Sequence, residues 1–432
     1  MHIKKHLSFT GLRKIISQRF GQIQDRRRGE VVYSLHDCLM SALAMMFFQD
    51  PSLLQFQRRL QQGLHRHNLQ SLFGVKEIPG DTQLRDLIDT CDPKQVEAIF
   101  ADFFRQLQRG KHLESYQVLD GRYLVVLDGT EYFSSEKICC PGCLFQKSVS
   151  GQVRYHHQIL QAALVHPACR QVIPLAPEPI KNEDGSEKQD CEINAGKRII
   201  KKIRQNHPKL KIIIGGDGLY SKQPFLEALQ KVGLSFVLVA KPTDHKVLFE
   251  WFGEIQKMKE TGHLEITDHQ KRRHCYEWAQ GLPLNGDPRA PEVNFFQYRL
   301  LVHGETTYHN SWVTDLKVNE HNVVELVKAG RSRWKIENEG FNTLKNQGYH
   351  IEHNFGHGQL NLSYIFFLLN LLAFFCHQVF ELTDPLYRRG RAAFSSRLEY
   401  WNQLRCTIRI WVFPDWETLL AVIIDPERHP PP

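Results

Sequence analysis

The chain has 432 residues, of which 42% are hydrophobic and 24% charged, a composition typical of a soluble globular protein with a sizeable core and two or three domains. The net charge of +8 and the isoelectric point near 8.9 favour a polyanionic partner, although a mildly basic surface without such a partner would carry the same charge.

Neither the start of the chain nor its most apolar segment indicates a membrane. The first nine residues, MHIKKHLSF, contain no apolar core of signal-peptide length, so we expect an intracellular protein whose ten cysteines are mostly reduced thiols. The most apolar segment, residues 364–380, contains Asn370, His377 and Gln378, which predicts a buried helix in place of a membrane span.

Residues 1–112 have the apolar spacing of helices. A strong apolar run covers 38–48, one helix is predicted to begin at Asp81, and another to follow Pro93 and continue to about Arg109. Basic side chains recur through this region: Arg26, Arg27, Arg28, Arg58, Arg59, His65, Arg66 and His67. A solvated surface is the default interpretation of such runs, and a DNA-binding helical region is the alternative if the rest of the chain acts on DNA.

From Gln117 the pattern changes to that of β-strands. Residues 117–119, the turn Asp120-Gly121 and residues 123–127 predict a hairpin whose second strand is nearly all apolar, as a central strand buried on both faces is. That strand is predicted to end at Asp128. Beyond it we predict strands at 155–165, 171–175, 211–215 and 235–240, and helices at 187–205 and 224–231.

Residues 242–316 predict an inserted, mainly β subdomain with alternating stretches at 263–268, 274–278, 294–303 and 306–313. A long helix from about Glu320 to Asn346 follows, and helices are predicted at 364–380 and 398–413. The predicted domains are a helical N-terminal region (1–112), an α/β domain (113–241 and 317–360), the insertion (242–316) and a helical C-terminal region (361–432).

Three acidic residues occupy informative places in this pattern. Asp128 ends the first central strand, Asp217 follows the fourth strand, and Glu337 lies on the long helix. At about 100° per residue, Glu337 falls within an apolar stripe and Glu339 on the opposite, solvated face. The stripe consists of Val323, Leu326, Val327, Trp334, Phe341 and Leu344. We therefore expect Glu337 to point inward and Glu339 outward.

A buried carboxylate needs a partner. For Glu337, an ion pair with Arg333 one turn earlier is one possibility, and a bound cation is the other. Because sites in open α/β sheets gather at strand ends, Asp128 and Asp217 would lie side by side if their strands are neighbours, and they would then repel each other unless a cation lay between them. Three such carboxylates suit two hard divalent ions, Mg²⁺ or Mn²⁺, which serve in-line phosphoryl displacement.

The order of elements is that of the ribonuclease H fold, and three motifs resemble those of bacterial insertion-sequence transposases of the DDE type. The motifs are Leu127-Asp128-Gly129-Thr130, Gly216-Asp217-Gly218-Leu219-Tyr220 and Arg333-Trp334-Lys335-Ile336-Glu337. The resemblance covers residues 117–360. It is to the group with a Tyr-x2-Arg-x3-Glu-x6-Lys signature and a β insertion before the last helix. Two positions depart from that signature: Gly330 stands at its Tyr, and Lys345 falls one residue late, which a bulge at Gly340 would explain.

The resemblance implies a fold, a function and the residues that serve it. The fold would be α/β, a ribonuclease H-like mixed sheet flanked by helices, with the β insertion and the helical terminal regions. Asp128, Asp217 and Glu337 would be catalytic and hold two Mg²⁺ or Mn²⁺ ions. The DNA-binding residues would be Arg331, Arg333 and Lys345, with Arg333 and Lys345 touching phosphates near the cut.

The implied protein is a cytoplasmic, nucleoid-associated bacterial enzyme that acts on double-stranded DNA as a homodimer or higher multimer. It would bind the terminal inverted repeats of its element, free a 3′-hydroxyl and join it to target DNA. The alternatives are a ribonuclease H-like nuclease without strand transfer and a catalytically silent DNA-binding derivative.

A cysteine-rich loop follows the first central strand. Cys140 and Cys143 have the Cys-x2-Cys spacing of a zinc knuckle, and the candidates for completing a tetrahedral structural zinc site are His156, His157 and Cys191. The sequence has no second Cys-x2-Cys, so free thiols are the alternative. Residues 352–358 also carry ligand-type side chains, which we interpret as a helix-capping loop with DNA contact as the alternative.

Overall fold

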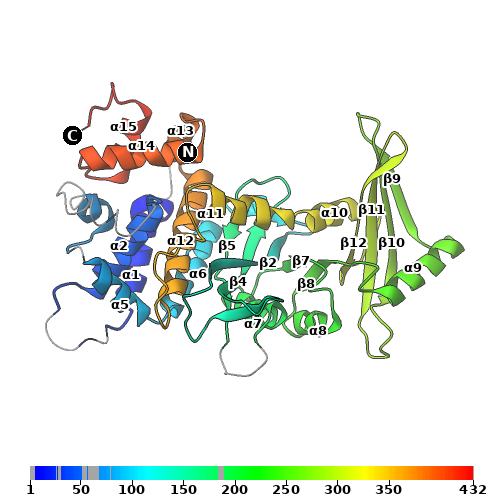
Figure 1. Cartoon of the computed structure of the whole chain (residues 1–432). Coiled ribbons are helices and arrows are strands. Elements are labelled where there is room, and N and C mark those ends of the chain that lie inside the picture. The colour runs from blue at the N-terminus through cyan, green and yellow to red at the C-terminus, as the bar shows by residue number, and fades with distance from the viewer. Residues whose placement is uncertain are drawn as a thin grey trace.

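A computed structural model describes residues 5–25, 27, 31–50, 56, 68–77, 79–182 and 189–431. The helices of the two terminal regions gather at one end of the molecule, and the strands that were predicted as an insertion stand at the other end (Figure 1). Of the basic residues noted in the N-terminal region, Arg27 is the one within the described part, and it pairs with Asp25 at 2.5 Å. The others lie outside the described residues.

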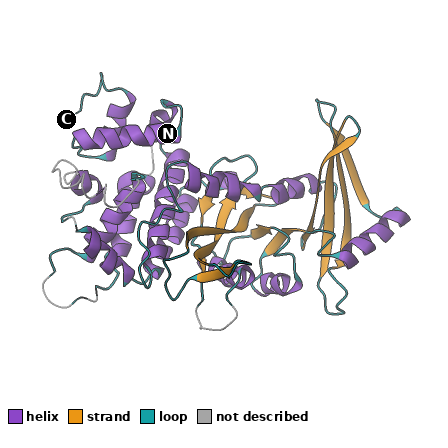
Figure 2. Ribbon diagram, in the orientation of Figure 1, coloured by secondary structure: helices purple, strands orange, loops and turns teal. Residues whose placement is uncertain are grey.

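In the described part of the chain, twelve strands form one mixed sheet, which extends from the helical end to the opposite end of the molecule (Figure 2). The main strand order is β3-β4-β2-β7-β8-β12-β11-β10-β9, while β1 pairs with β2, and β5 and β6 pair with β4. β2 is antiparallel to β4 and parallel to β7, which is in turn parallel to β8. The strands are β1 Gln117–Val118, β2 Arg122–Ser135, β3 Leu144–Lys147, β4 Val153–Val165, β5 Ile173–Pro174, β6 Glu178–Ile180, β7 Ile212–Gly216, β8 Ser235–Val239, β9 Gly262–Thr267, β10 Arg273–Pro283, β11 Glu292–Val302 and β12 Glu305–Thr314.

Helices cover both faces of the central strands. α7 (Glu192–Asn206) and α8 (Gln223–Lys231) lie on one face, and α10 (Val323–Arg331) and α11 (Asn342–Asn346) on the other (Figure 1). This double covering explains why residues 123–127 of β2 are apolar without alternation and all buried. The helix predicted from about 187 begins later, because Cys191 is extended, with φ −137° and ψ 162°, and acts as the N-cap of α7.

The predicted β insertion is present as β9 to β12, but it is not a separate sheet. β12 pairs antiparallel with β8, with Trp312 opposite Val239, so the inserted strands extend the central sheet. A helix that the sequence pattern did not reveal, α9 (Lys246–Met258), precedes these strands and packs on β10. Its Phe252 ring lies 4.5 Å from that of Phe295 in β11, which anchors the helix to the sheet.

The terminal regions fold together around one helix. α12 (Leu362–Thr383) contacts α2, α5 and α6 of the N-terminal region and also β5. It is long and apolar enough to cross a membrane by length and composition alone, but 89% of its most apolar window is buried inside the protein. Asn370, which interrupts its apolar run, donates a hydrogen bond to the carbonyl of Tyr349 at 2.7 Å, so the predicted buried helix is confirmed.

The remaining described helices follow the predicted pattern closely. The helices expected at Asp81 and after Pro93 are confirmed as α5 and α6, and the C-terminal region is helical as expected. Serine and aspartate caps begin several of them; for example, the Ser34 hydroxyl accepts the backbone N–H of Asp37 at 2.9 Å. The helices are α1 Phe9–Phe20, α2 Leu35–Phe47, α5 Asp81–Asp89, α6 Lys94–Arg109, α13 Pro385–Ala392, α14 Arg397–Ile410 and α15 Trp416–Ile424.

The long helix predicted from about 320 to 346 is interrupted twice. α10 ends at Arg331, Ser332 and Arg333 form a turn, and the π-helix η4 (Ile336–Phe341) leads into α11. A π-helical turn holds one residue more than the α-helical turn it replaces. The bulge that the sequence analysis considered at Gly340 is therefore present, as the π-helix η4.

Candidate active site and a cysteine–histidine cluster

Asp128 and Asp217 stand at the same level of two adjacent parallel strands. β2 and β7 are paired up to Val126 and Gly215. Asp128 lies two residues beyond Val126 on β2, and Asp217 lies two residues beyond Gly215, directly after the end of β7. β7 ends at Gly216, whereas β2 continues beside β4. The prediction that Asp128 ends its own strand is therefore wrong. What ends there is the neighbouring strand, and its end leaves the space beside Asp128 uncovered by β7.

Arg333 connects these aspartates to the helix on the other face of the site. Its Nη1 atom lies 2.5 Å from Oε1 of Glu337 and 3.7 Å from Oδ2 of Asp128. The negative charge of Asp217 also contributes to raising the pKa of Arg333. The ion pair between Arg333 and Glu337, which the sequence left open, is present. The structure thus brings two of the predicted acids, Asp128 and Glu337, to one guanidinium, and the third, Asp217, near enough to raise the pKa of Arg333.

The electrostatics of this group are unfavourable for three free carboxylates. Burial, reinforced by Glu337, Glu192 and Asp217, raises the pKa of Asp128 to about 7 despite the nearby Arg333 charge. An additional positive charge near such a carboxyl group would stabilise its ionised form, because that charge reduces the repulsion from the neighbouring carboxylates.

Glu192 is a fourth carboxylate that the sequence did not single out. It is the first residue of α7, and its Oε1 accepts a hydrogen bond from the Tyr220 hydroxyl at 2.6 Å. It also closes over Gly129, where a Cβ atom would lie 2.6 Å from the Glu192 Oε2 atom. Burial raises the pKa of Glu192, and Asp217 adds to the effect. An acidic residue in a first helical turn is so common that it carried no signal.

The two glutamates on η4 face different partners, but not with the burial that the stripe predicted. The Glu337 side chain is 47% exposed. The Glu339 side chain is 27% exposed and lies 3.7 Å from the Arg170 guanidinium. Trp334 is 43% exposed, so the predicted placement of Trp334 and Glu337 on a buried stripe is wrong. The turn at Ser332 and the π-helical winding shift the phase, and the buried positions become Lys335 and Ile336, among others.

The other predicted DNA-binding side chains have protein partners. Lys345 pairs with Glu352, with 2.7 Å between Nζ and Oε1. The Arg331 guanidinium lies over the ring of Tyr308, 4.8 Å from its centroid, and also near Tyr298, so it contacts the inserted strands. Of the three, Arg333 is the one that lies at the acidic group.

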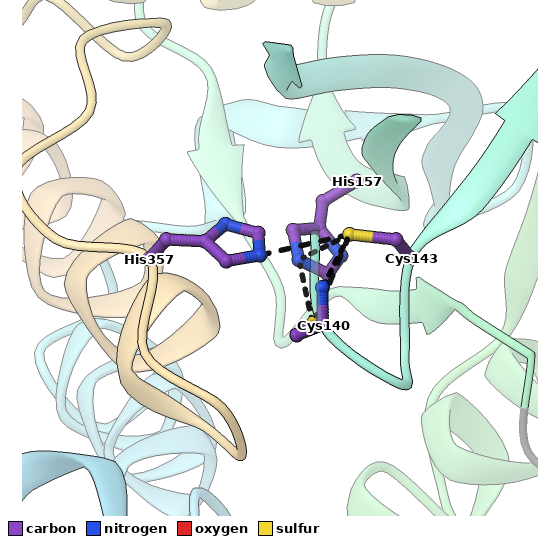
Figure 3. A group of neighbouring side chains, drawn as sticks. All are labelled: Cys140, Cys143, His157 and His357. Atoms are coloured by element: carbon purple, nitrogen blue, oxygen red, sulfur yellow. Dashed lines mark hydrogen bonds between the residues drawn. The ribbon is translucent and has the colours of Figure 1, made fainter. Parts of the chain in front are cut away.

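A second group of side chains meets beside β2 and β4 (Figure 3). Cys140 and Cys143 come from the loop before β3, His157 from β4, and His357 from the loop before α12. Their ligand atoms all lie within 4.8 Å of one another, with three of the four residues buried. Hydrogen bonding from Cys143 is the main reason that the pKa of the Cys140 thiol is lowered, and the two imidazoles add to it. This cluster has the donor types and the spacing to hold a metal ion.

Of the three candidates for completing this site, His157 is confirmed as part of the cluster, whereas Cys191 and His156 are wrong. Cys191 is exposed and caps α7, away from the cluster, and His156 faces the opposite side of β4 from His157 because neighbouring strand residues alternate. His357 takes the place expected for Cys191. The sequence interpretation of residues 352–358 as a capping loop missed it, because no local spacing relates position 357 to position 143.

The two sites differ in how closely their donor atoms approach. Within the described residues, the cysteine–histidine cluster is the one set of three or more Cys, His, Asp or Glu side chains with all ligand atoms within 4.8 Å. Asp128, Asp217 and Glu337 do not form such a set, and Arg333 lies between Asp128 and Glu337. No protein-family model matches the chain, and a search of curated proteins returns no match.

Proposed function

We propose that the chain is a DDE-type transposase with a ribonuclease H-like catalytic domain. It binds the terminal inverted repeats of a mobile element, cleaves a phosphodiester and joins the freed 3′-hydroxyl to target DNA. The observation that carries the proposal is that Arg333 pairs with Glu337 and lies 3.7 Å from Asp128, while Asp217, which follows the strand next to that of Asp128, is near enough to influence both Asp128 and Arg333.

The order of elements supports this proposal. The first acid lies on β2, the first long strand, and the second follows β7, its parallel neighbour. The third lies on the helix that returns to the sheet after β9 to β12. Acids delivered in this order to one edge of a mixed sheet fit the expected ribonuclease H-like arrangement better than an accidental surface cluster, because three separate segments must meet.

The donor set fits hard divalent cations. Asp128, Asp217 and Glu337 offer carboxylate oxygens, which Mg²⁺ and Mn²⁺ prefer, and they would hold two such ions. When bound, the ions would supply activation of the attacking oxygen and stabilisation of the leaving oxygen. Asp128, whose pKa is raised to about 7, must give up its proton to act as a ligand. Glu337 must leave Arg333 for the same purpose.

Arg333 and Lys345 suit a role in positioning DNA. Arg333 pairs with Glu337 and Lys345 with Glu352. A phosphate would compete with these carboxylates for both cations, because phosphate accepts bidentate hydrogen bonds from a guanidinium and is attracted by an ammonium charge. Exchange of Arg333 from Glu337 to a phosphate would free the carboxylate as DNA arrives, which couples substrate binding to completion of the site.

The partners of this function are the element ends and the target duplex, with the protein acting as a homodimer or higher multimer in the bacterial cytoplasm, on the nucleoid. The overall positive charge supports a polyanionic partner. The DNA flanking the gene supplies the substrate for a test, since a mobile element carries inverted repeats there.

The test is an assay of cleavage and joining with the full chain, a duplex that ends in those repeats, a plasmid target and Mg²⁺ or Mn²⁺. Asp128→Ala, Asp217→Ala and Glu337→Ala should each abolish both products while DNA binding stays nearly intact, since they remove metal ligands and not phosphate contacts. Asp120→Ala is the control, because Asp120 lies at the exposed β1–β2 turn and pairs with Arg122.

The other outcomes of this assay would support the alternative functions. Cleavage without joined product would indicate the nuclease alternative, and binding without cleavage would indicate the silent derivative. Full activity in any of the three alanine variants would remove that residue from the site.

A further inference from the structure

We propose that Cys140, Cys143, His157 and His357 form a tetrahedral structural zinc site that fastens the loop before α12 to the central sheet. This inference is independent of the proposed function, because it uses none of the acidic residues. Two of the ligands come from the β2–β3 loop, one from β4 and one from a segment 214 residues after Cys143.

The distances between donor atoms match a tetrahedral zinc ion. The Cys140 and Cys143 sulfurs are 3.8 Å apart, and His157 Nε2 lies 3.5 Å from each of them. The Cys143 sulfur lies 3.6 Å from His357 Nε2. With Zn–S bonds of about 2.3 Å and Zn–N bonds of about 2.0–2.1 Å, a regular tetrahedron places two sulfurs about 3.8 Å apart and a sulfur and a nitrogen about 3.5 Å apart.

Hydrogen bonding among the four side chains explains these distances less well than a shared metal ion does. His157 Nε2 is equally close to two sulfurs, although one imidazole nitrogen has a single hydrogen or a single lone pair to offer. The Cys143 sulfur is likewise close to three other donor atoms. Mutual closeness of four ligand atoms is what a shared central cation produces. A disulfide is excluded, because its sulfurs would lie about 2.05 Å apart.

The surroundings suit a closed site. The rings of Tyr132 and Phe133 pack against His157, and Phe133 also contacts His357, with 4.2 Å between ring centroids. Cys143, His157 and His357 are buried. Four protein ligands with no open position mark a structural and not a catalytic zinc, and the Cys-x2-Cys pair provides two of them.

The segment that carries His357 is also held from the other side. Asp89 at the end of α5 accepts the backbone N–H groups of Gln359, Leu360, Asn361 and Leu362. His157 lies opposite Phe133 on β2, the strand that carries Asp128. Zinc would therefore join the start of α12 to the strand of the acidic group, and its binding would contribute directly to the stability of this junction.

The test begins with zinc content. The full chain, produced with zinc in the medium and dialysed, should hold about one zinc per molecule by mass spectrometry of the metal, as expected for one four-ligand site. Cys143→Ser and His357→Ala should lose most of it, whereas Cys191→Ser, the cysteine that the sequence favoured, should keep it. A wild-type chain without zinc, or zinc that depends on Cys191 and not on His357, would overturn the proposal.

Cobalt substitution of the wild-type chain tests the metal site even if the alanine and serine variants fold poorly. Co²⁺ in the wild-type chain should give the visible bands of a tetrahedral site and thiolate-to-cobalt charge transfer. In His357→Cys, charge transfer should rise by about one half, because the thiolate ligands increase from two to three. Absence of charge transfer in the wild-type chain refutes the site, and no increase in a folded His357→Cys removes His357 from it.

Discussion

At the scale of single residues, Arg333 is the positively charged side chain that pairs with the acidic group. It lies between Glu337 and Asp128 and neutralises part of a cluster that also contains Asp217 and Glu192. In the absence of metal, burial of Asp128 and the neighbouring carboxylates together outweigh the effect of that guanidinium, and the pKa of Asp128 is raised to about 7. The cost of keeping these acids together should therefore be measurable as a loss of stability.

We predict that Asp128→Asn stabilises the metal-free protein at pH 7.5. The folded chain keeps a proton on Asp128 up to about pH 7, whereas the unfolded chain loses it near pH 4, so the folded chain binds more protons between these values and its free energy of unfolding falls as the pH rises. The asparagine removes this loss, on the order of 1 kcal/mol for a partly solvated carboxyl.

Urea unfolding in the presence of a chelator, at pH 7.5 and at pH 5, measures this effect. The gain in the free energy of unfolding should be larger at pH 7.5 than at pH 5. A variant that is less stable than the wild type at pH 7.5 would contradict the repulsion that we infer around Asp128.

The assignment of the third acid gives the second prediction. Under the transposase function proposed above, Glu337→Gln should abolish cleavage and Glu339→Gln should keep it, because Glu337 shares Arg333 with Asp128 and Glu339 lies against Arg170. Both changes keep side-chain volume and remove one charge, so each is the matched control for the other. The measurement is the cleavage rate on element ends at saturating Mg²⁺, and the reverse ranking of the two variants would move the third acid to position 339.

At the scale of elements, α10, which precedes the turn at Ser332 and η4, packs closely on Trp312 of β12. Gly330 lies against the fully buried Trp312, and a Cβ atom there would approach the Trp312 Nε1 atom to 2.6 Å. The indole thus occupies the space that a side chain at position 330 would need. Gly340 within the π-helix has no such neighbour, since its nearest contact would be 3.9 Å away at Ile336.

The pair of glycines yields an element-scale prediction. Gly330→Ala should lower the free energy of unfolding by about 1–3 kcal/mol through overpacking against Trp312. Gly340→Ala should leave it unchanged or raise it by up to about 1 kcal/mol, because alanine restricts the unfolded chain more than glycine does and meets no obstacle here. Denaturant unfolding of both variants, with m-values compared, makes the measurement, and equal losses in the two would show that the indole is not what excludes a side chain.

At the scale of the whole molecule, the terminal regions and the central sheet are joined through the loop before α12. Asp89, at the end of α5, accepts four successive backbone N–H groups from that loop. Although burial raises the pKa of Asp89, these four hydrogen bonds lower it by more, so the net shift is downward. One carboxylate thereby holds together segments about 270 residues apart in sequence.

We predict that Asp89→Ala lowers the free energy of unfolding by about 1–3 kcal/mol at neutral pH, because the backbone donors lose their acceptor. Because the folded pKa of Asp89 is depressed, the stability that it contributes is present above the unfolded pKa and is lost as the pH falls through the folded value. The difference between variant and wild type should therefore shrink in acid. Asp86→Ala, on an exposed position of the same helix, is the control and should change stability by less than about 0.5 kcal/mol.

The sequence by itself determined the parts of this protein that depend on local physics. Turn residues at Asp120 and Gly121, the capped start of α5 near Asp81 and the apolar run of β2 each specify an element through backbone preference and side-chain period, and each appears in the structure.

Only the tertiary structure decided which distant side chains meet. His357 joins Cys140 and Cys143 because the loop before α12 is held by Asp89, and Glu192 approaches Asp217 because α7 packs on the face of β4. The phase that exposes Trp334 follows from a turn and a π-helix, which an ideal period of 100° per residue cannot represent. These contacts depend on sheet register and long-range packing, and no short window of sequence contains that information.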